Sequence, residues 1–325
     1  MVQKEITILM ATYNGAAYLA MQLDSLLRQT YMNWKVIIRD DGSTDDTLLI
    51  IADYINRDSR ISLTDFGTAH GSACINFSAL TEWAIKNACQ YVLFADQDDI
   101  WKDDKIAVSM QYILAMEAEY GIEMPLLCYS TFQFIDEKGT LLPQRMKLPS
   151  ELELRVLLNE NHAWGCTMIL NAAALNLIVP IPPEAVNHDY WIALVIAALG
   201  KTKLIPQDLL FYRQHLLNVS GNVDKMSFTK RFNRYITDRD TMLIPLSANL
   251  VTISLFNYRY KTRLSRSTQK MLHDFIKAYY TGFTKLALTM MNYRIFKIGF
   301  AQNLAYFYTL LLLRAKVVKD IRIIR

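Results

Sequence analysis

The feature that most constrains the fold is a regular alternation within the first hundred residues. Short apolar runs at residues 5–10, 34–38 and 91–95 have the length and composition of buried strands, and the segments between them carry apolar residues at helical spacing. Strands that alternate with helices in this way form a mostly parallel sheet with helices on both faces. The chain is therefore predicted to have an α/β fold.

Each of these three predicted strands ends in a polar cluster. The clusters are Thr-Tyr-Asn-Gly at residues 12–15, Arg-Asp-Asp-Gly-Ser at residues 39–43 and Asp-Gln-Asp-Asp at residues 96–99. In open α/β sheets, ligands bind beyond the carboxyl ends of the strands. The sequence thus predicts that the three turns meet in one pocket at a single edge of the sheet.

The third cluster places Asp96, Asp98 and Asp99 within four residues. Oxygen-rich sites of this kind suit hard cations such as Mg²⁺ or Mn²⁺. A solvated turn that caps the next helix is the plainer explanation of an isolated Asp-x-Asp triplet. A calcium loop is excluded because Trp101 stands where that loop needs glycine, and neither common phosphate-binding glycine motif occurs.

The rest of the chain divides into two regions with opposite charge. Residues 1–224 carry 16 Lys and Arg against 27 Asp and Glu, whereas residues 225–325 carry 19 against 4. In the first region we expect strands at 126–134, 164–170, 203–205 and 209–212, and a helix at 190–199. The second region shows only helical patches rich in Lys, Arg, Tyr and Phe, which predicts a basic helical region after residue 224.

The basic region favours a phosphate-rich partner, either a membrane or a nucleic acid. Its longest uncharged stretch, residues 298–313, has 16 residues, whereas a membrane span needs roughly 20. We interpret it as an amphipathic helix at a membrane interface; a helical domain with a solvated basic face or a homodimer contact are the alternatives. Four separated cysteines and a short N-terminal apolar run favour a reducing compartment and no signal peptide.

Six motifs in order give the chain a family resemblance over residues 5–222. They are ATYNG, QLDSLLRQTY, RDDGSTDDT, FADQDDIW, NHDYW and FYRQHLLNVSG. The sequence resembles family-2 inverting glycosyltransferases of the GT-A fold, and DQDDIW, HDYW and YRQH are most similar to bacterial rhamnosyltransferases of cell-wall, capsule or O-antigen synthesis. The resemblance implies dTDP-L-rhamnose as donor, a UDP-hexose as the alternative, and a glycan on polyprenyl diphosphate as acceptor.

The resemblance also implies roles for individual residues. Asp189 is the expected catalytic base, with His188 as second choice, and Asp98 with His215 would hold Mn²⁺ or Mg²⁺. Thr12, Tyr13, Asn14, Asp41, Asp96 and Arg213 are expected at the donor, Asp41 on the pyrimidine N3–H and Asp96 near the ribose; Trp164, Gly165, Cys166 and Trp191 are expected at the acceptor. Arg213 could pair with a phosphate or with the acidic cluster. The chain lacks the QxxRW pattern of processive synthases, which favours a single addition.

Two other functions are weaker fits to the sequence. Sugar nucleotidyltransferases usually open with a glycine-rich basic loop, where this chain has ATYNGAAY. A nucleic-acid-binding protein could use the basic region, but carboxylates near a phosphate backbone repel it, so we expect no nucleic-acid partner. We expect the protein in the cytoplasm, at the inner face of the cell membrane.

Overall fold

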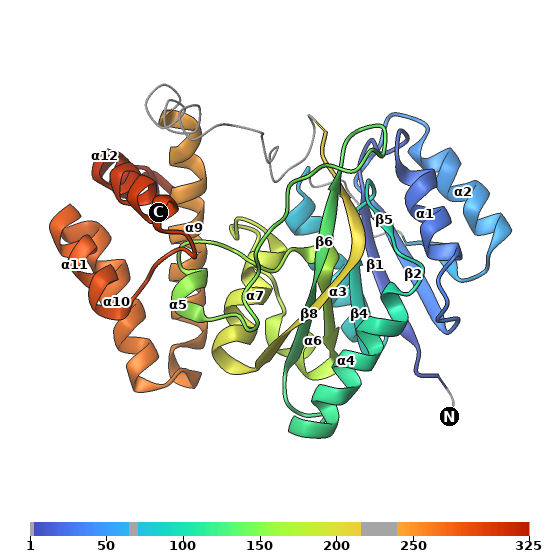
Figure 1. The fold of residues 1–325 in the computed structure, drawn as a ribbon, viewed down its shortest axis with the longest axis horizontal. Coiled ribbons are helices and arrows are strands. Elements are labelled where there is room, and N and C mark those ends of the chain that lie inside the picture. The colour runs from blue at the N-terminus through green and yellow to red at the C-terminus, as the bar shows by residue number, and fades with distance from the viewer. Residues whose placement is uncertain (1–2, 65–70, 216–238, 325) are drawn as a thin grey trace.

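The structure is a computed structural model that describes residues 3–64, 71–215 and 239–324. Its centre is an eight-stranded sheet with the order β3-β2-β1-β4-β7-β6-β8-β5 (Figure 1). The strands are β1 Ile6–Thr12, β2 Trp34–Asp40, β3 Ile61–Leu63, β4 Tyr91–Ala95, β5 Ile100–Trp101, β6 Leu126–Ile135, β7 Met168–Asn171 and β8 Lys201–Arg213. This arrangement confirms the predicted α/β fold.

Helices cover both faces of the sheet. One face carries α1 Leu19–Leu27, α2 Thr47–Arg57 and α4 Lys105–Tyr120, and the other carries α3 Ala73–Lys86, α6 Ala172–Ile178 and α7 His188–Leu199. The short helices α5 Leu154–Leu157 and η1 Gly165–Thr167 lie in the connections between them. Strands β1 and β4 are buried on both sides, which explains why their residues are almost all apolar.

The sheet is mixed and not uniformly parallel. Strands β1 to β4 are parallel to one another, whereas β7 pairs antiparallel with both β4 and β6. The two short strands expected at 203–205 and 209–212 form one continuous strand, β8, which runs parallel to β6 through register irregularities. The two-residue strand β5 follows residues 96–99, which we call the acidic turn, and it pairs antiparallel with β8. The chain just after this turn is therefore bonded to the end of β8.

The C-terminal part of the chain is helical, as predicted. It contains α9 Arg239–Tyr260, η2 Lys261–Arg263, α10 Arg266–Thr281, α11 Phe283–Tyr293 and α12 Phe300–Ile324, which lie together beside the sheet (Figure 1). One hydrophobic core includes Phe77 on α3, Trp191 on α7, and Phe256 and Phe275 on α9 and α10. The predicted boundary at residue 224 lies outside the described residues and stays a prediction.

None of the helices in the described ranges combines the length and apolar character required to cross a membrane.

Candidate functional site

The turn after β1 is bonded to the turns after both β2 and β4. The backbone N–H of Tyr13 donates to Gln97 Oε1 over 2.8 Å, and Gln97 Nε2 donates back to the Tyr13 carbonyl over 2.9 Å. On the other side, the N–H of Asn14 donates to Ser43 Oγ over 2.8 Å. Asn14 has a φ of 46°, a left-handed conformation that asparagine tolerates better than most residues. The three polar turns therefore meet at one edge of the sheet, as the sequence predicted.

The two carboxylates after β2 have different neighbours. Asp40 accepts hydrogen bonds from the Thr12 hydroxyl over 2.8 Å and from the backbone N–H of Ser43 over 2.7 Å, so it shapes the turn. Asp41 is buried, and its Oδ1 lies 3.1 Å from Nη1 of Arg39, which is buried as well. Of the residues predicted at the donor, Thr12 and Asp41 are buried, whereas Tyr13 is exposed.

The two residues predicted to hold a metal ion are direct neighbours. His215 Nε2 lies 2.7 Å from Asp98 Oδ2, and the His215 ring packs beside Tyr18. The pairing of β5 with β8 explains this contact because it brings the end of β8 beside the acidic turn. This contact is a hydrogen bond between the two side chains. Its oxygen and nitrogen are ligand types that suit Mn²⁺, and the neighbouring carboxylates suit Mg²⁺.

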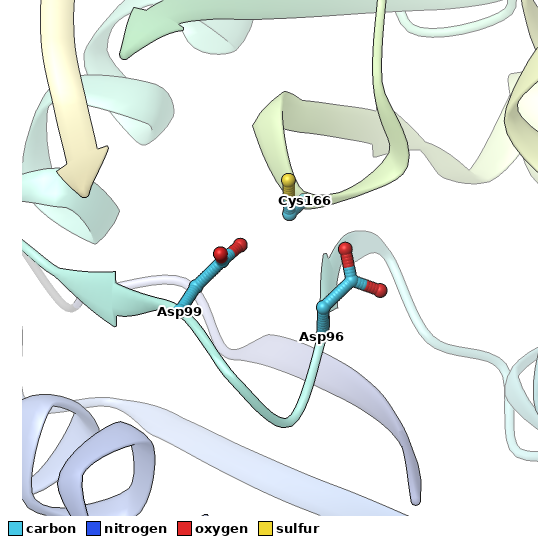
Figure 2. A group of neighbouring side chains, drawn as sticks. All are labelled: Asp96, Asp99 and Cys166. Carbon is cyan, nitrogen blue, oxygen red and sulfur yellow. The ribbon is translucent and has the colours of Figure 1, made fainter. Parts of the chain in front are cut away.

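Asp96 and Asp99 extend from the same turn toward the thiol of Cys166 (Figure 2). One potential ligand atom from each of the three residues lies within 4.8 Å of the other two. Burial and the neighbouring Asp98 and Asp189 carboxylates raise the pKa of Asp96 to about 7. Burial and the other carboxylates of the turn raise the pKa of Asp99 well above its ordinary value. Within residues 3–64, 71–215 and 239–324, Asp99 Oδ2 has no hydrogen-bond partner.

Two buried cations lie next to this acidic turn. Lys105 is fully buried, its Nζ donates to the carbonyl of Cys166 over 2.8 Å, and burial lowers its pKa to about 8. Arg213 is also fully buried; its Nε donates to the carbonyl of Asp98 over 2.9 Å and its backbone N–H to Asp99 Oδ1 over 3.2 Å. Of the two roles left open for Arg213, the structure therefore places it against the acidic cluster.

Asp189 lies in the first turn of α7, next to Gly165. Its Oδ2 accepts a hydrogen bond from the Gly165 N–H over 3.2 Å, and Oδ1 has no partner in the part of the chain that the structure describes. Burial raises the pKa of Asp189 to about 6. Because its charge raises the pKa of Asp96, the two carboxylates belong to one electrostatic environment.

His188 precedes Asp189 but lies in the hydrophobic core. Its ring stacks on Phe77 with centroids 4.0 Å apart, and burial lowers its pKa to about 3. A Cβ at position 165 would come within 2.5 Å of His188 Nε2, so only glycine fits between His188 and the rest of the site. This packing requirement could not be predicted from the motifs.

The predicted acceptor residues do not lie in one exposed surface. Trp164 is partly exposed and packs against Phe132 and Tyr212, with ring centroids 4.6 and 4.9 Å away. Trp191 is fully buried, and its indole N–H donates to the carbonyl of Ile178 over 2.8 Å. Cys166 is buried below the acidic turn. Trp191 is thus a core residue beneath the site, and its predicted acceptor contact does not fit the structure.

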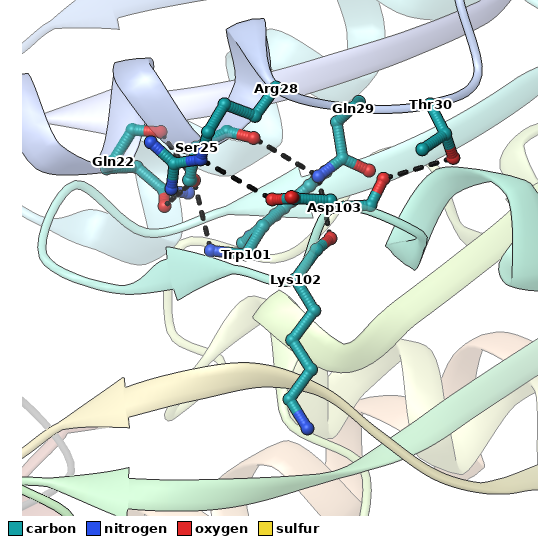
Figure 3. A network of polar contacts seen from close by, with 8 residues as sticks. All are labelled: Gln22, Ser25, Arg28, Gln29, Thr30, Trp101, Lys102 and Asp103. Atoms are coloured by element: carbon teal, nitrogen blue, oxygen red, sulfur yellow. Dashed lines mark hydrogen bonds and ion pairs between the residues drawn. The ribbon is translucent and has the colours of Figure 1, made fainter.

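Buried polar side chains in α1 and just after it, to which we assigned no role, hold the segment after the acidic turn (Figure 3). Ser25 Oγ accepts from the backbone N–H of Trp101 over 3.0 Å. Gln29 donates to the carbonyl of Lys102 over 2.7 Å and accepts from the N–H of Ile106 over 3.0 Å. Polar residues four apart on the buried face of an otherwise apolar helix were the available signal.

Comparisons with known proteins agree on one family. The sequence profile described as "Glycosyl transferase family 2" matches residues 7–123. The UDP-Glc:alpha-D-GlcNAc-diphosphoundecaprenol beta-1,3-glucosyltransferase WfaP of Escherichia coli is 30% identical over 224 residues, which cover 67% of this chain and 80% of that protein. The dTDP-rhamnosyl transferase RfbG of Shigella flexneri is 33% identical over 123 residues, covering 38% of this chain and 40% of RfbG.

Solved structures show the same fold at lower identity. Residues 1–349 of TarS from S. aureus, crystallised in complex with UDP-GlcNAc, superpose with a TM-score of 0.57 at 16% identity. The match covers 98% of this chain and 89% of that one. This likeness supports the GT-A fold with a C-terminal helical region. With the WfaP similarity and the matching family profile, it leads to one conclusion: the chain belongs to glycosyl transferase family 2.

Proposed function

We propose that the protein is a metal-dependent inverting glycosyltransferase that adds one sugar to a lipid-linked glycan. The observation that carries this proposal is the position of Asp189. Its carboxylate has one oxygen held by Gly165 and the other without a partner in the described chain, beside the turn that contains Asp96. A base next to the donor site is what direct displacement at an anomeric carbon requires.

The donor would bind across the three joined turns. Tyr13 would contact the nucleotide from the rim of the pocket, and Asn14 would keep the turn in shape. As the family resemblance implies, Asp41 would accept a hydrogen bond from the pyrimidine N3–H, and Asp96 would lie near the ribose. Arg213 would support the site from beneath, because this fully buried side chain donates to the carbonyl of Asp98 and its backbone N–H donates to Asp99 Oδ1.

Asp98 and His215 are the residues we assign to a divalent metal ion, Mn²⁺ or Mg²⁺. Their 2.7 Å hydrogen bond keeps the two side chains side by side, and a bound ion would take both atoms as ligands in place of this bond. When bound, such an ion neutralises the charge that develops on the departing nucleoside diphosphate. The elevated pKa values of Asp96 and Asp99 are consistent with a site that concentrates negative charge for a cation.

Asp189 would remove the proton of the attacking hydroxyl from the face opposite the leaving diphosphate. A pKa of about 6 leaves this carboxylate mostly ionised at neutral pH while making it a stronger base than an ordinary aspartate. His188 is the weaker candidate, because its pKa of about 3 and its stacking on Phe77 remove it from proton transfer near neutrality.

For the sugar, dTDP-L-rhamnose remains our first candidate, supported by the motif resemblance and by the similarity to RfbG over part of the chain. UDP-glucose is the second candidate because WfaP, whose name specifies that donor, is similar over a larger share of the chain. The acceptor we propose is a glycan on a polyprenyl diphosphate. A lipid-linked acceptor places the enzyme at the cytoplasmic face of the cell membrane, with the basic helical region toward the lipid.

A panel of nucleotide sugars tests this proposal. Purified protein is incubated with dTDP-L-rhamnose, UDP-glucose and GDP-mannose, each with Mn²⁺, Mg²⁺ or EDTA, and nucleoside diphosphate release is measured with a polyprenyl-diphosphate-linked acceptor. We expect turnover with dTDP-L-rhamnose, none with EDTA, and inversion at the anomeric carbon by NMR of the product. Turnover with UDP-glucose alone would establish the second candidate, and no turnover with any donor would contradict the function.

A single substitution tests the assignment of Asp98 as a metal ligand. Asp98→Asn should abolish turnover because the amide loses the negative charge that attracts the cation. The control is Asp53→Asn, which removes an exposed carboxylate that forms a surface ion pair with Arg57 on α2. Full activity of Asp98→Asn in the same assay would remove Asp98 from the metal site.

A further inference from the structure

The last helix, α12, exposes an apolar stripe. Phe300, Leu304 and Leu311 are 81%, 58% and 54% exposed. Successive residues of an α-helix are rotated by about 100°, so positions 300, 304 and 311 fall within roughly 40° of one another. We call these three residues the α12 stripe.

A second face of the same helix packs inside the protein. Tyr306, Leu310, Leu313 and Val317 are buried, and Leu310 and Val317 belong to the core that α12 shares with α9 and α10. A helix that is apolar on more than its packed face is normally covered by something else. The α12 stripe is therefore not needed to pack α12 against the rest of this chain. Ile298, just before the helix, adds a further exposed apolar side chain.

The charge around the stripe indicates what covers it. Residues 239–319 contain 13 Lys and Arg but only 2 Asp and no Glu. Arg294 precedes the helix, and Lys319 follows the stripe along α12; both are exposed. An apolar helix face bordered by cations is the pattern of a helix that lies in the interface of an anionic membrane.

A second copy of the chain fits less well. A twofold dimer would place the same surface of each copy against the other. That contact would bring two strongly basic helical regions together, and the repulsion between them would oppose association. An anionic lipid surface buries the same apolar side chains and also neutralises the charge.

We propose that the α12 stripe docks the protein on an anionic lipid surface, with Phe300, Leu304 and Leu311 inserted among the lipids and the neighbouring cations at the headgroups. The inference rests on the proposed function, since it places the enzyme where a lipid-linked acceptor is found. It goes further by naming the surface that binds and the chemistry of its partner.

Vesicle co-sedimentation tests this docking surface. The full chain is mixed with vesicles of phosphatidylcholine and phosphatidylglycerol in a 1:1 ratio, of phosphatidylcholine alone, and of the mixture at high salt. The variant is the triple substitution Phe300→Ser, Leu304→Ser, Leu311→Ser. The control is Met32→Ser, Leu49→Ser, Ile122→Ser, which removes three exposed apolar side chains from the sheet part of the molecule.

We expect the wild type and the control to bind the anionic vesicles equally, and the stripe variant to partition at least tenfold less. Binding should also fall at least tenfold on phosphatidylcholine alone and at high salt. If the triple variant does not fold, as judged by circular dichroism, Phe300→Ser alone should weaken partition severalfold because this side chain is the most exposed of the three.

Two results would overturn the docking surface. One is equal vesicle binding by the stripe variant and the control. The other is a wild-type dimer in light scattering that the stripe variant converts to a monomer, since the stripe would then be a subunit contact. Hydrolysis of the nucleotide sugar without vesicles is measured in parallel. Stripe-dependent vesicle binding without turnover of any donor would contradict the proposed function and leave the docking surface intact.

Discussion

At the residue scale, one peptide bond separates two titratable side chains with opposite environments. Asp189 points toward the acidic turn, whereas His188 stacks on Phe77 in the core. Burial disfavours the charged form of both, so the pKa of Asp189 rises to about 6 and that of His188 falls to about 3. Their different positions relative to the site decide which one can act on substrate.

Asp189→Asn should retain donor binding but lose transfer by about 10²–10⁴-fold, because the amide cannot accept the hydroxyl proton. In the wild type, kcat/KM should fall about tenfold per pH unit below pH 6, where Asp189 becomes protonated. Donor affinity is measured by calorimetry and transfer by product formation. A variant that keeps more than a third of wild-type activity would contradict the assignment of the base.

His188 should make the fold sensitive to acid. Its pKa lies near 3 in the folded protein and near 6.5 when unfolded, so only the unfolded chain takes up this proton between those values. Its contribution to stability is complete above pH 6.5 and falls by at most about 1.4 kcal/mol per pH unit below it. Urea unfolding of the wild type and His188→Gln across pH 4.5–8 should show their free energies of unfolding converging as the pH falls. A constant difference would contradict the neutral, buried imidazole.

Gly165 separates His188 from the acidic turn, and a methyl group there has no room. Gly165→Ala would place Cβ 2.5 Å from His188 Nε2, and the ring cannot retreat because it stacks on Phe77. We expect Asp189 to be displaced with its neighbour, which should lower kcat at least tenfold while KM for the donor changes less. An unchanged kcat would show that Asp189 keeps its position in the variant and would contradict this prediction.

The family resemblance of the motifs led to residues that lie around the acidic turn, including Asp98, His215 and Asp189. The motifs did not show whether Trp191 would lie in the pocket or in the hydrophobic core. Helix α7 is apolar on nearly all sides, so its periodicity does not reveal which face lies toward a ligand. The buried cation Lys105 was missed for a related reason: sequence alone does not show when a lysine is paired inside a fold.

At the element scale, α1 and Gln29 just after it support the segment that follows the acidic turn. Gln29 is buried and bonds to the backbone at Lys102 and Ile106. Gln29→Ala removes the side-chain partner of the Ile106 N–H and one of the two donors to the Lys102 carbonyl, which should lower the free energy of unfolding by about 1–3 kcal/mol. It should also weaken Mn²⁺-dependent donor binding, because the turn loses its support. The exposed substitution Gln3→Ala is the control, and equal stability of the two variants in urea unfolding would contradict this role.

The sequence predicted the long elements well and the short ones poorly. Strands β1, β2 and β4 each contain a mostly apolar run, and α7 ends just before Gly200 as expected. The strands β3 and β5 have three and two residues, too few to show a period. Strand β8 was divided in the prediction because Pro206, Gln207 and Asp208 interrupt its apolar pattern, and that polar stretch falls within the irregular pairing with β6.

At the scale of the whole molecule, the opposite charges of the two regions do not correspond to two separate cores. Phe256 on α9 is fully buried in the core that also contains Phe77 and Trp191. Charge counts can separate regions along a chain, but they do not show what the apolar residues of each region pack against. This shared core is what the sequence could not reveal.

Phe256→Ala should therefore destabilise the catalytic part as well as the helices. Removing a fully buried phenylalanine costs about 3–5 kcal/mol. Thermal unfolding followed by circular dichroism and loss of donor binding should shift together to a lower temperature. Tyr258→Ala, two residues away on the same helix and 85% exposed, is the control. Donor binding that survives the melting of the helices would show that the two parts unfold independently.

The pairing of β5 with β8 has a consequence for how such an enzyme can diversify. His215 reaches Asp98 only because Ile100 is opposite Phe211 in the antiparallel ladder. One residue inserted into this part of β8 would slide the strand by about 3.3 Å and turn its side chains to the opposite face. An insertion at this end of β8 should therefore separate His215 from Asp98, whereas exchanges of side chains around the pocket leave this pair in place and can change the sugar preference.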